Sequence, residues 1–431
     1  MAAPWTRRDL LKRAGLSALA AGVPWVIPGR ALGKDGSVAP SDRITMGSIG
    51  LGWMGPGNLS AFLSEKDCKV LAVCDIDREH LEAAKQTVDR HYGNRDCTAT
   101  AEMLDVIGRD DIDALSLALP DHWHATAAVL GARAGKDIYG EKPFAHSLRE
   151  GRIMADTLKR YGRVWQTGSW QRSVANFYQA VAIVRSGRIG KIKSVEVGLP
   201  SGVYALKRED VAVREPPPQF DYDRWLGPAP WSPYAPCRVH VNWRWVLDFG
   251  GGQLMDWVGH HLDIAHWGMD CDTTGPVAIY DARGTYLNEW PWDSATSYSF
   301  RARYRNGIEM TVSSSIRGGT KWIGEEGWVW VNRGGIEAEP KSLLKLEISP
   351  GEAGIIRSLN HYRNFLDCVK SRELTITPAE VAHRSASVGQ LGQIALRVRR
   401  DLRWNPETEE IIGDPEAARL LGNAMRPPWS L

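Results

Sequence analysis

Apolar runs alternate with amphipathic stretches over residues 44–166, beginning with the apolar run that opens at Ile44. The continuous apolar runs at 69–74 and 113–119 predict buried strands, because a parallel strand is covered by helices on both faces. Helical stretches at 77–92 and 125–134 separate these runs. Strands and helices that alternate at this spacing predict a doubly wound parallel sheet, a Rossmann-type α/β domain.

The pattern changes after residue 166, where helical stretches give way to strand-like alternation. Strands are predicted at 192–197, 277–282, 295–304, 309–315 and 328–332. Helices are predicted at 147–162, 173–186, 253–267 and 358–371, and capping boxes are predicted at Ser147–Glu150 and Thr377–Glu380. Residues 167–431 are therefore expected to form an α+β domain with a large, mainly antiparallel, open-faced sheet. The Pro- and Trp-rich stretch 198–240 is too irregular to assign.

The first residues have a character of their own. Arg7 and Arg8 form a twin-arginine pattern, followed by an apolar run from Ala14 to Ile27. This run is too short, and too interrupted by prolines, to anchor the chain stably in a membrane. We expect residues 1–33 to be a twin-arginine signal peptide and residues 34–43 a linker or arm. Export by that route, which carries folded proteins, predicts a periplasmic or extracellular protein.

Charge and cysteine content exclude several classes of function. The net charge is +2, and removing the five basic residues and one acid of residues 1–33 leaves −2, which does not favour nucleic-acid binding. The six cysteines are scattered without a CxxC pair, so no metal site or disulfide framework is expected. Nineteen tryptophans, mostly expected in the core, slightly favour a carbohydrate ligand, because indole rings stack on sugar faces.

A glycine-rich turn follows the first predicted strand. Its spacing, GxGxxG between a strand and a helix, predicts a turn where the backbone approaches a pyrophosphate at a helix N-terminus. Asp75, at the end of the second strand, suits the ribose hydroxyls of NAD and would repel the extra phosphate of NADP, although Arg78 lies close by. NAD is therefore expected, with NADP less favoured. The turn residues expected to bind cofactor are Gly50, Gly52, Trp53, Met54 and Gly55.

Two further strand ends are expected to contribute to the cofactor site. Ligands of doubly wound sheets bind beyond the carboxyl ends of the strands, and Glu141 and Lys142 follow one such strand. Pro120, His122 and His124 follow another; for the two histidines, capping or turn-forming roles fit equally well.

A third group lies on the predicted helix 253–267. Asp256 and His260 are four residues apart and Asp263 follows three later, so the three are expected to share one helix face. Acids and a histidine on an otherwise apolar helix need partners. Three interpretations satisfy that need: the residues form a sugar-binding acid/base group, a buried structural cluster or a metal site. Arg172, after the crossover between the domains, is a further candidate for substrate binding.

Together these motifs resemble the Gfo/Idh/MocA oxidoreductase family, and in particular its exported bacterial branch. The motifs are Gly50-x-Gly-x-x-Gly, Asp121-His-Trp-His, Glu141-Lys-Pro and Gly252-x-x-x-Asp256-x-x-x-His260-x-x-Asp263. The resemblance extends from about Ile44 to the C-terminus. It implies NAD or NADP, a pyranose or cyclitol substrate, a catalytic set of Lys142, Asp256 and His260, and a cis bond at Lys142–Pro143.

The chemistry of alcohol oxidation fits that set, because a base must take the hydroxyl proton as hydride leaves the carbon. A histidine, with an ordinary pKa near 6.5, is the better base; Lys142 would orient or relay the proton, and Asp256 would bind hydroxyls or orient the imidazole. We therefore expect an NAD(P)-dependent sugar or cyclitol oxidoreductase, with tightly bound, internally recycled cofactor. A redox-neutral NAD-dependent glycoside hydrolase and a non-catalytic NAD-binding protein stay open, and a homodimer or homotetramer is expected.

Overall fold

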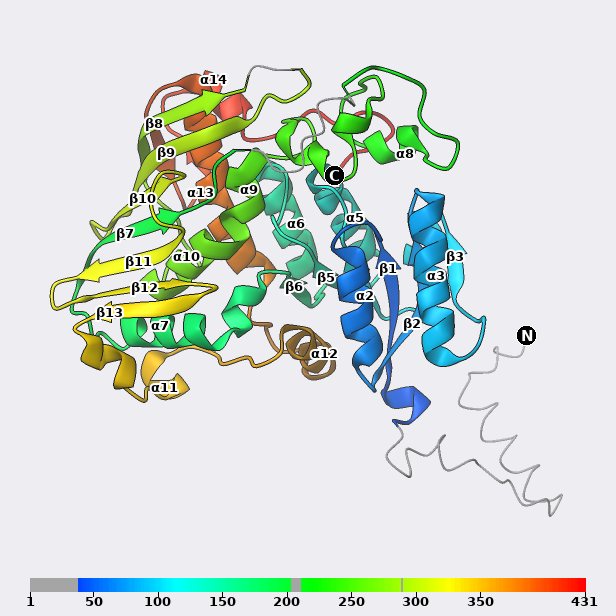
Figure 1. Cartoon of the computed structure of the whole chain (residues 1–431), viewed down its shortest axis with the longest axis horizontal. Coiled ribbons are helices and arrows are strands. Elements are labelled where there is room, and N and C mark those ends of the chain that lie inside the picture. The colour runs from blue at the N-terminus through cyan, green and yellow to red at the C-terminus, as the bar shows by residue number, and fades with distance from the viewer. Residues whose placement is uncertain (1–37, 203–210, 288–289) are drawn as a thin grey trace, which may run out of the picture. The chain divides into compact units, whose positions relative to one another are not determined.

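The structure is a computed structural model that describes residues 38–202, 211–287 and 290–431 (Figure 1). The chain divides into two units, residues 1–43 and residues 44–431. In the first unit a short 3-10 helix, η2, covers Pro40–Asp42. The predicted signal, residues 1–33, and the first residues of the predicted arm, 34–37, lie outside the described residues.

The N-terminal part of the second unit is a six-stranded parallel sheet, as the sequence predicts. Its strand order is β3-β2-β1-β4-β5-β6, which places β1 at the centre between β2 and β4. The strands are β1 Ile44–Ile49, β2 Cys68–Cys74, β3 Thr98–Thr100, β4 Ala114–Leu117, β5 Asp137–Gly140 and β6 Trp165–Thr167. Every residue of β4 and β5 is buried, as expected for parallel strands that are covered on both faces, and β4 lies within the predicted apolar run 113–119.

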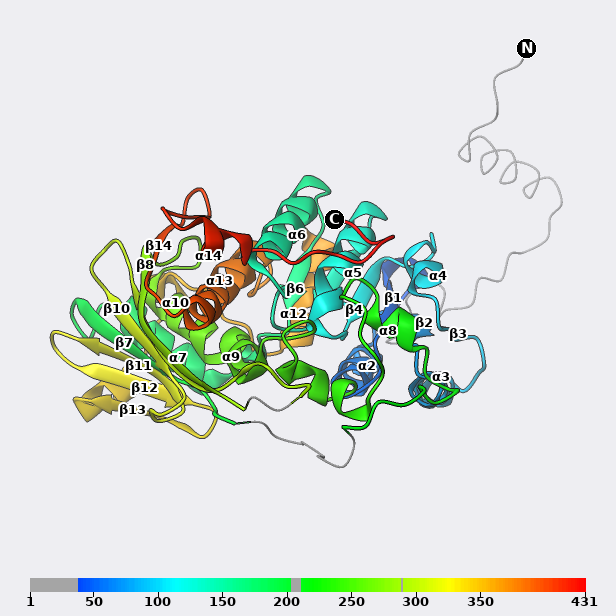
Figure 2. The same ribbon diagram turned by 90° about the horizontal axis from the view of Figure 1, so that it is seen from above.

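Helices cover both faces of this sheet. Seen from above, α2 and α3 lie on one face and α4, α5 and α6 on the other (Figure 2). The helices are α2 Gly55–Ser64, α3 Arg78–Tyr92, α4 Met103–Ile107, α5 Asp121–Arg133 and α6 Leu148–Arg160. The Asp77 side chain caps α3, and the predicted capping box of Ser147 and Glu150 opens α6. Helix α5 begins at Asp121, four residues before its apolar stretch, so the Asp-His-Trp-His motif lies in its first turn.

The C-terminal part is built on a nine-stranded mixed sheet of order β13-β12-β11-β7-β10-β9-β8-β14-β15. Its pairs are antiparallel except for β7 with β10. The strands are β7 Ile192–Gly198, β8 Ala278–Tyr286, β9 Ala295–Arg303, β10 Glu309–Ser313, β11 Gly319–Gly324, β12 Trp328–Asn332, β13 Gly335–Glu339, β14 Leu402–Asn405 and β15 Glu410–Ile411. Short strands such as β11, which begins and ends with glycine, carry too little apolar alternation to be predicted.

Helices α7 (Ala175–Arg185), α10 (Asp263–Met269) and α13 (Ala379–Val398) pack against this sheet, and α12 (His361–Ser371) lies below β5 and β6 in Figure 1. The predicted helix 253–267 is interrupted. It consists of α9 (Gly252–Trp257), a π-helical turn, η7 (Val258–Leu262), and α10. A π-helical turn holds more residues per turn than an α-helix, so residues on its two sides do not keep α-helical spacing.

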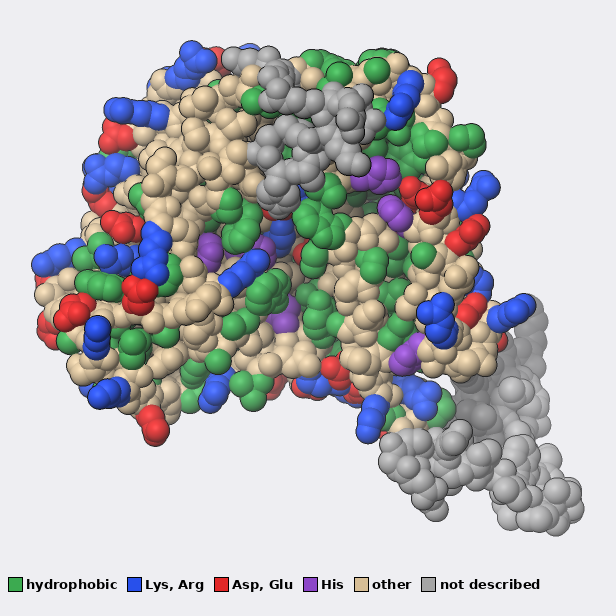
Figure 3. Space-filling model, in the orientation of Figure 1, with side chains coloured by type: hydrophobic (Ala, Val, Ile, Leu, Met, Phe, Trp, Pro, Cys, Tyr) green, Lys and Arg blue, Asp and Glu red, His purple; other side chains and the backbone are tan. Residues whose placement is uncertain are grey.

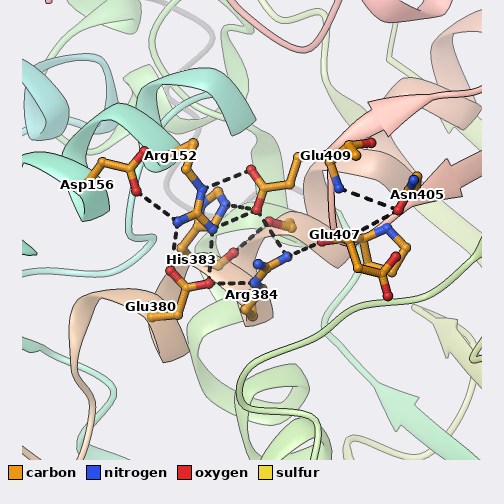
Figure 4. Close-up of polar contacts among 11 residues, drawn as sticks. Arg152, Asp156, Glu380, His383, Arg384, Asn405, Glu407 and Glu409 are labelled. Carbon is orange, nitrogen blue, oxygen red and sulfur yellow. Dashed lines mark hydrogen bonds and ion pairs between the residues drawn. The ribbon is translucent and has the colours of Figure 1, made fainter.

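A network of ion pairs joins α6 to α13 and to the β14–β15 turn (Figure 4). Arg152 lies 2.8 Å from Glu380 and 2.7 Å from Glu409, and Arg384 contacts both acids. His383 Nε2 lies 2.8 Å from Glu409. Burial would raise the pKa of Glu380, but Arg152 and Arg384 lower it to about 2. Glu380 therefore serves this network, and the capping box predicted there is wrong: Pro378 is the N-cap and makes no side-chain cap bond.

Among the residues that the structure describes, no helix has both the length and the apolar character needed to cross a membrane.

Candidate active site at the carboxyl ends of the parallel strands

A cavity of about 590 Å³ opens at the carboxyl ends of β1, β2, β4 and β5. This volume is within the range of cavities that hold small-molecule ligands. The space-filling view shows hydrophobic side chains around the centre of this face, with histidine and basic side chains among them (Figure 3). The predicted cofactor-binding residues that line it are Gly50, Gly52, Trp53, Met54, Asp75, Pro120, Glu141 and Lys142.

The glycine turn is shaped by close backbone approaches. Gly50 has φ 84°, and a Cβ there would lie 2.4 Å from the carbonyl oxygen of Ala118. Gly55 does not line the cavity; a Cβ there would lie 2.0 Å from the carbonyl oxygen of Gly50. Gly55 therefore allows α2 to begin directly against the turn, which leaves the N-terminus of α2 pointing at the cavity.

Asp75 connects the turn to the next helix. Its Oδ2 accepts a hydrogen bond from the Leu51 amide at 2.6 Å, and its Oδ1 accepts one from the Asp77 amide at 2.8 Å. His80 Nδ1 lies 3.8 Å from Oδ1. The carboxylate is thus fixed at the end of β2, on the cavity wall, where the sequence predicts a ribose-binding acid.

Lys142 extends from the end of β5 to the C-terminal part. Its Nζ donates hydrogen bonds to the Asp256 backbone oxygen and to Asp256 Oδ1, both at 2.8 Å. Arg244 Nε donates to the same Oδ1 at 3.1 Å. Burial would raise the pKa of Asp256, but Lys142 and Arg244 lower it well below its usual range. The predicted cis peptide at Lys142–Pro143 is confirmed.

Arg244 is a site residue that sequence analysis missed. Its guanidinium lies 4.4 Å from the ring centre of Trp243 and 5.0 Å from that of Trp53 in the glycine turn. It therefore links the turn to Asp256. The only sequence sign of it is an arginine between two tryptophans at 243–245, a pattern that suits stacking but does not identify the partner.

His260 is buried in the π-helical turn, 5 % exposed. Its Nδ1 makes no hydrogen bond to any described residue, and the rings of Trp257 and Trp170 lie 5.4 and 6.4 Å away. Burial, with the nearby charges of Lys142 and Arg333, holds its pKa well below the ordinary value. The imidazole is therefore neutral at neutral pH and can accept a proton.

Asp256 and His260 do not line the cavity themselves. The turn that carries His260 packs on Lys142, since a Cβ on Gly259 would lie 2.8 Å from Lys142 Cβ. Lys142 and Arg244 line the cavity and both bond to Asp256. The three predicted catalytic side chains are thus gathered at one place, with Lys142 on the wall.

Two buried carboxyl groups near Lys142 have raised pKa values. Burial raises the pKa of Asp121, in the first turn of α5, to about 8. Burial also raises the pKa of Glu141, whose Oε1 accepts a hydrogen bond from Asn58 at 3.0 Å. Both acids line the cavity. A neutral carboxylic acid donates as well as accepts, so the wall offers more than acceptors.

Arg172 and Asp263, predicted as substrate ligands, pair with each other in the structure. Arg172 donates to both oxygens of Asp263, at 2.8 and 2.9 Å, and to Asp272 at 2.7 Å. The Arg172 and Asp263 side chains are each 2 % exposed and do not line the cavity. The π-helical turn lies directly before Asp263 and ends the α-helical spacing from which the prediction placed Asp263 beside His260. Their role as substrate ligands stays a prediction.

His122 and His124 are not among the residues that line the cavity, and their rings contact backbone oxygens, which agrees with the structural role that the sequence left open for them. His122 Nε2 lies 2.9 Å from the Trp225 backbone oxygen. The two ring nitrogens of His124 lie 2.7 and 2.9 Å from the backbone oxygens of Pro143 and Leu119. Burial lowers the pKa of both, to about 3 and about 4. They hold the loops around the site in place.

Part of the cavity wall comes from a segment without predicted structure. This covering segment, residues 219–249, pairs with the end of β2: the Arg78 amide donates to the Gln219 oxygen at 3.0 Å, and Asp77 forms an antiparallel bridge with Phe220. Its aromatic residues form their own core, which includes Phe220, Tyr222, Trp225, Tyr234, Trp243, Trp245 and Phe249. Many of the tryptophans are core residues for this reason.

Two sequence profiles of one family match nearly all of the second unit. One, described as the NAD-binding Rossmann fold of an oxidoreductase family, matches residues 44–169. The other, its C-terminal alpha/beta domain, matches residues 179–431. The protein therefore has the two-domain architecture of an NAD-binding oxidoreductase. It belongs to the Gfo/Idh/MocA oxidoreductase family.

Curated relatives match over shorter lengths. An uncharacterized oxidoreductase of Rhizobium meliloti is 29% identical over 140 residues, covering 32% of this chain and 40% of its own. A glycosyl hydrolase family 109 protein of Shewanella pealeana is 30% identical over 169 residues, covering 36% and 37%. The match thus spans about two-fifths of the length of these relatives.

Solved structures share the fold over most of the chain. A WlbA dehydrogenase from Chromobacterium violaceum, solved with NADH and UDP-GlcNAcA, covers 89% of this chain and 99% of its own, at 19% identity and a TM-score of 0.64. An aldose-aldose oxidoreductase from Caulobacter crescentus, complexed with glycerol, covers 84% and 99%, at 18% identity and a TM-score of 0.60.

The residues of the cavity fit NAD. Gly50 and Gly55 let the turn pack closely between Ala118 and the start of α2, and the N-terminus of α2 favours the negative charge of a pyrophosphate. Asp75 provides the acceptor for ribose hydroxyls on the same wall. Lys142 lies at the end of a different strand on the same wall, where the redox end of a dinucleotide is expected.

Proposed function

We propose that this protein oxidises a secondary hydroxyl of a sugar or cyclitol with NAD as hydride acceptor. The observation that carries the proposal is the contact of Lys142 with Asp256 beside neutral, buried His260, at the edge of the nucleotide cavity. NAD, when bound, supplies the hydride-accepting carbon. The family and the cofactor class are supported by both profiles; the sugar is the proposed part.

Each side chain has a definite role in this proposal. In this proposal His260 accepts the hydroxyl proton as the hydride leaves, since its neutral ring has a nitrogen lone pair and its Nδ1 makes no hydrogen bond to any described residue. Lys142 donates a hydrogen bond to the substrate oxygen and is oriented by Asp256. Arg244 keeps Asp256 ionised and in place. Trp257 and Trp170 flank His260, and the Arg333 guanidinium lies 4.7 Å from the centre of each ring, so this group of side chains holds the imidazole in place.

A second candidate is a redox-neutral glycoside hydrolase, which is favoured by the relatives named as glycosyl hydrolase family 109 proteins. In that reaction a ring hydroxyl is transiently oxidised to a ketone. A proton is then removed from the carbon next to the ketone, and the aglycone leaves from the following carbon as a double bond forms between the two. Water adds across that double bond, and the hydride taken in the first step returns to the ketone. The same residues serve both candidates, because each begins with alcohol oxidation.

We also propose that the cofactor is retained and recycled inside the protein, and that the protein is exported and works as a homodimer or homotetramer. The twin-arginine pattern motivates the proposal of export. A protein outside the cytoplasm has no NAD pool to draw on, so export in turn motivates retention of the cofactor. The covering segment supports retention, because it forms part of the cavity wall over the nucleotide.

The test compares Lys142→Ala and His260→Ala with the unmodified protein, on a panel of free sugars, cyclitols and nitrophenyl glycosides. Each variant should lose at least about a hundredfold in turnover, the scale of a positioned acid or base, yet bind NAD normally. Exposed Lys341→Ala and His91→Asn are the controls. Near-normal turnover in both active-site variants would contradict the proposed site.

The two candidates separate in heavy water without added NAD. Hydrolysis through a ketone releases the aglycone and places deuterium on the carbon next to the oxidised one. Simple oxidation releases no aglycone. Aglycone release with deuterium in the sugar would establish the hydrolase.

A further inference from the structure

Three metal-binding side chains meet on the wall of the nucleotide cavity. Asp77, His80 and His240 each offer one ligand atom, and these atoms all lie within 4.8 Å of one another. Asp77 and His80 come from the start of α3, whereas His240 comes from the covering segment, residues 219–249. The cluster therefore joins two parts of the chain that are far apart in sequence.

His240 is held toward the other two by its surroundings. Its backbone has φ 55°, a left-handed conformation that non-glycine residues rarely adopt. Its ring lies 5.7 Å from the ring of His80 and 5.4 Å from that of Phe220, the residue that pairs with Asp77. The conformation is thus stabilised by contacts with the same residues that bring the ligands together.

Asp77 can bind a cation without giving up its role in the helix. Its Oδ1 accepts a hydrogen bond from the Glu79 amide at 2.9 Å, which caps α3. A carboxylate has a second oxygen with its own lone pairs. The capping bond also fixes the orientation of the carboxyl group, which reduces the entropy lost when an ion binds.

We propose that Asp77, His80 and His240 bind a divalent transition-metal ion, for which zinc is our assignment. Two imidazole nitrogens and one carboxylate oxygen are a donor set that zinc prefers, with one coordination position left for water. Since all three residues line the cavity, that position is accessible from the nucleotide side.

The surroundings of the cluster agree with this assignment. Asp75 Oδ1 lies 3.8 Å from His80 Nδ1, and a carboxylate beside the ring of a metal-binding histidine is a common supporting contact.

A bound ion would tie the covering segment to α3. In the described residues the segment reaches this region through the Asp77–Phe220 bridge and the Arg78–Gln219 and Ile76–Asp221 hydrogen bonds. An ion at His240 would add a link about twenty residues further along. We infer that release of the nucleotide requires this part of the wall to move away from α3, so zinc should slow its release.

Zinc binding is measured on the full NAD-loaded protein by competition with a chromophoric chelator. The unmodified protein should bind one zinc ion per chain. His240→Asn, which tolerates the left-handed backbone, and His80→Gln should each weaken binding at least tenfold. Exposed His91→Asn, at the other end of α3, is the matched control and should bind as the unmodified protein does. Circular dichroism without metal checks that the variants fold.

The second measurement is the rate of NAD release into excess unlabelled nucleotide, with and without zinc. Zinc should slow release severalfold in the unmodified protein and in His91→Asn, and leave His240→Asn unaffected. Micromolar zinc that does not bind, or that binds His240→Asn equally tightly, would overturn the site. Zinc that binds without slowing release would overturn the link between the segments. Neither readout requires substrate, so failure here is distinct from failure of the proposed reaction.

Discussion

Arg244 Nε lies 3.1 Å from Asp256 Oδ1, the same oxygen atom that accepts a hydrogen bond from Lys142 Nζ at 2.8 Å. The Asp256 side chain is 11% exposed, so two cations share one largely buried carboxylate. Arg244 comes from the covering segment and also lies over Trp53 of the glycine turn. The position of Lys142 therefore depends on a residue of the covering segment as well as on its own strand.

Replacing Arg244 with alanine should lower turnover by about tenfold or more, the scale of one lost charge-assisted hydrogen bond. Arg244→Lys should recover part of the loss, because it restores the charge without the planar stacking group. Steady-state kinetics measures the turnover of both variants, and Arg283→Ala, which replaces an exposed arginine on β8, serves as the control. Equal turnover for Arg244→Ala and the control would show that Arg244 does not act through Asp256.

Asp75→Ala should weaken NAD binding by about 1–2 kcal/mol, the scale of lost charge-assisted hydrogen bonds. Two losses combine in this variant. The ribose loses its acceptor, and the Leu51 and Asp77 amides lose the carboxylate that holds the turn. Titration of the nucleotide-free protein with NAD and with NADP gives the affinities. A preference of the unmodified protein for NADP would refute the role assigned to Asp75.

Arg172→Met should destabilise the protein by about 3–5 kcal/mol, because it leaves Asp263 buried without its partner. Arg317→Met is the matched control: it breaks the exposed pair with Glu337 and should change stability by less than about 1 kcal/mol. Urea unfolding of both variants tests this, with Arg172→Lys as a milder change. If Arg172→Met instead kept full stability and lost substrate affinity, a role in substrate binding would be supported.

Asp121 should make the protein less stable as pH rises. Its pKa is about 8 in the folded state against 3.8 ordinarily, so between these values the folded state keeps a proton that the unfolded state releases. The free energy of unfolding should therefore fall with rising pH in that window, by at most about 1.4 kcal/mol per unit. Asp121→Asn, which cannot titrate, should flatten this slope.

Urea unfolding between about pH 5 and about pH 8 measures the slope. Asp110→Asn, at an exposed position before β4, serves as the control and should keep the slope of the unmodified protein. Identical slopes for Asp121→Asn and the unmodified protein would mean that Asp121 is ionised in the folded state.

The parallel domain could be predicted because its signals are local and agree with one another. Buried strands such as 114–117 are mostly apolar, and helix starts at Asp77 and Ser147 carry capping residues. The glycine turn, Asp75 and Lys142 follow strand ends, and parallel strands bring their carboxyl ends to one edge. These residues meet on one cavity wall for that reason.

The differences from the sequence predictions arise where position depends on distant partners. Asp263 was expected beside His260 from α-helical spacing, but the π-helical turn at 258–262 alters that spacing. His122 and His124 have the sequence position of cofactor ligands, and only the folded loops reveal the backbone oxygens that their rings contact. Arg244 lies in an irregular segment, where no periodicity indicates which way a side chain faces.

The nucleotide cavity also fixes an order of events during synthesis. Its wall includes Gly50 and Asp75, then residues of the covering segment, and finally Trp429, whose ring packs edge-on against Trp123 at 4.8 Å. A ribosome that has completed the six parallel strands has therefore made only the floor of the cavity. The wall is complete only when the chain has been made as far as Trp429, so we expect the full enclosure of a nucleotide to be a late step in maturation.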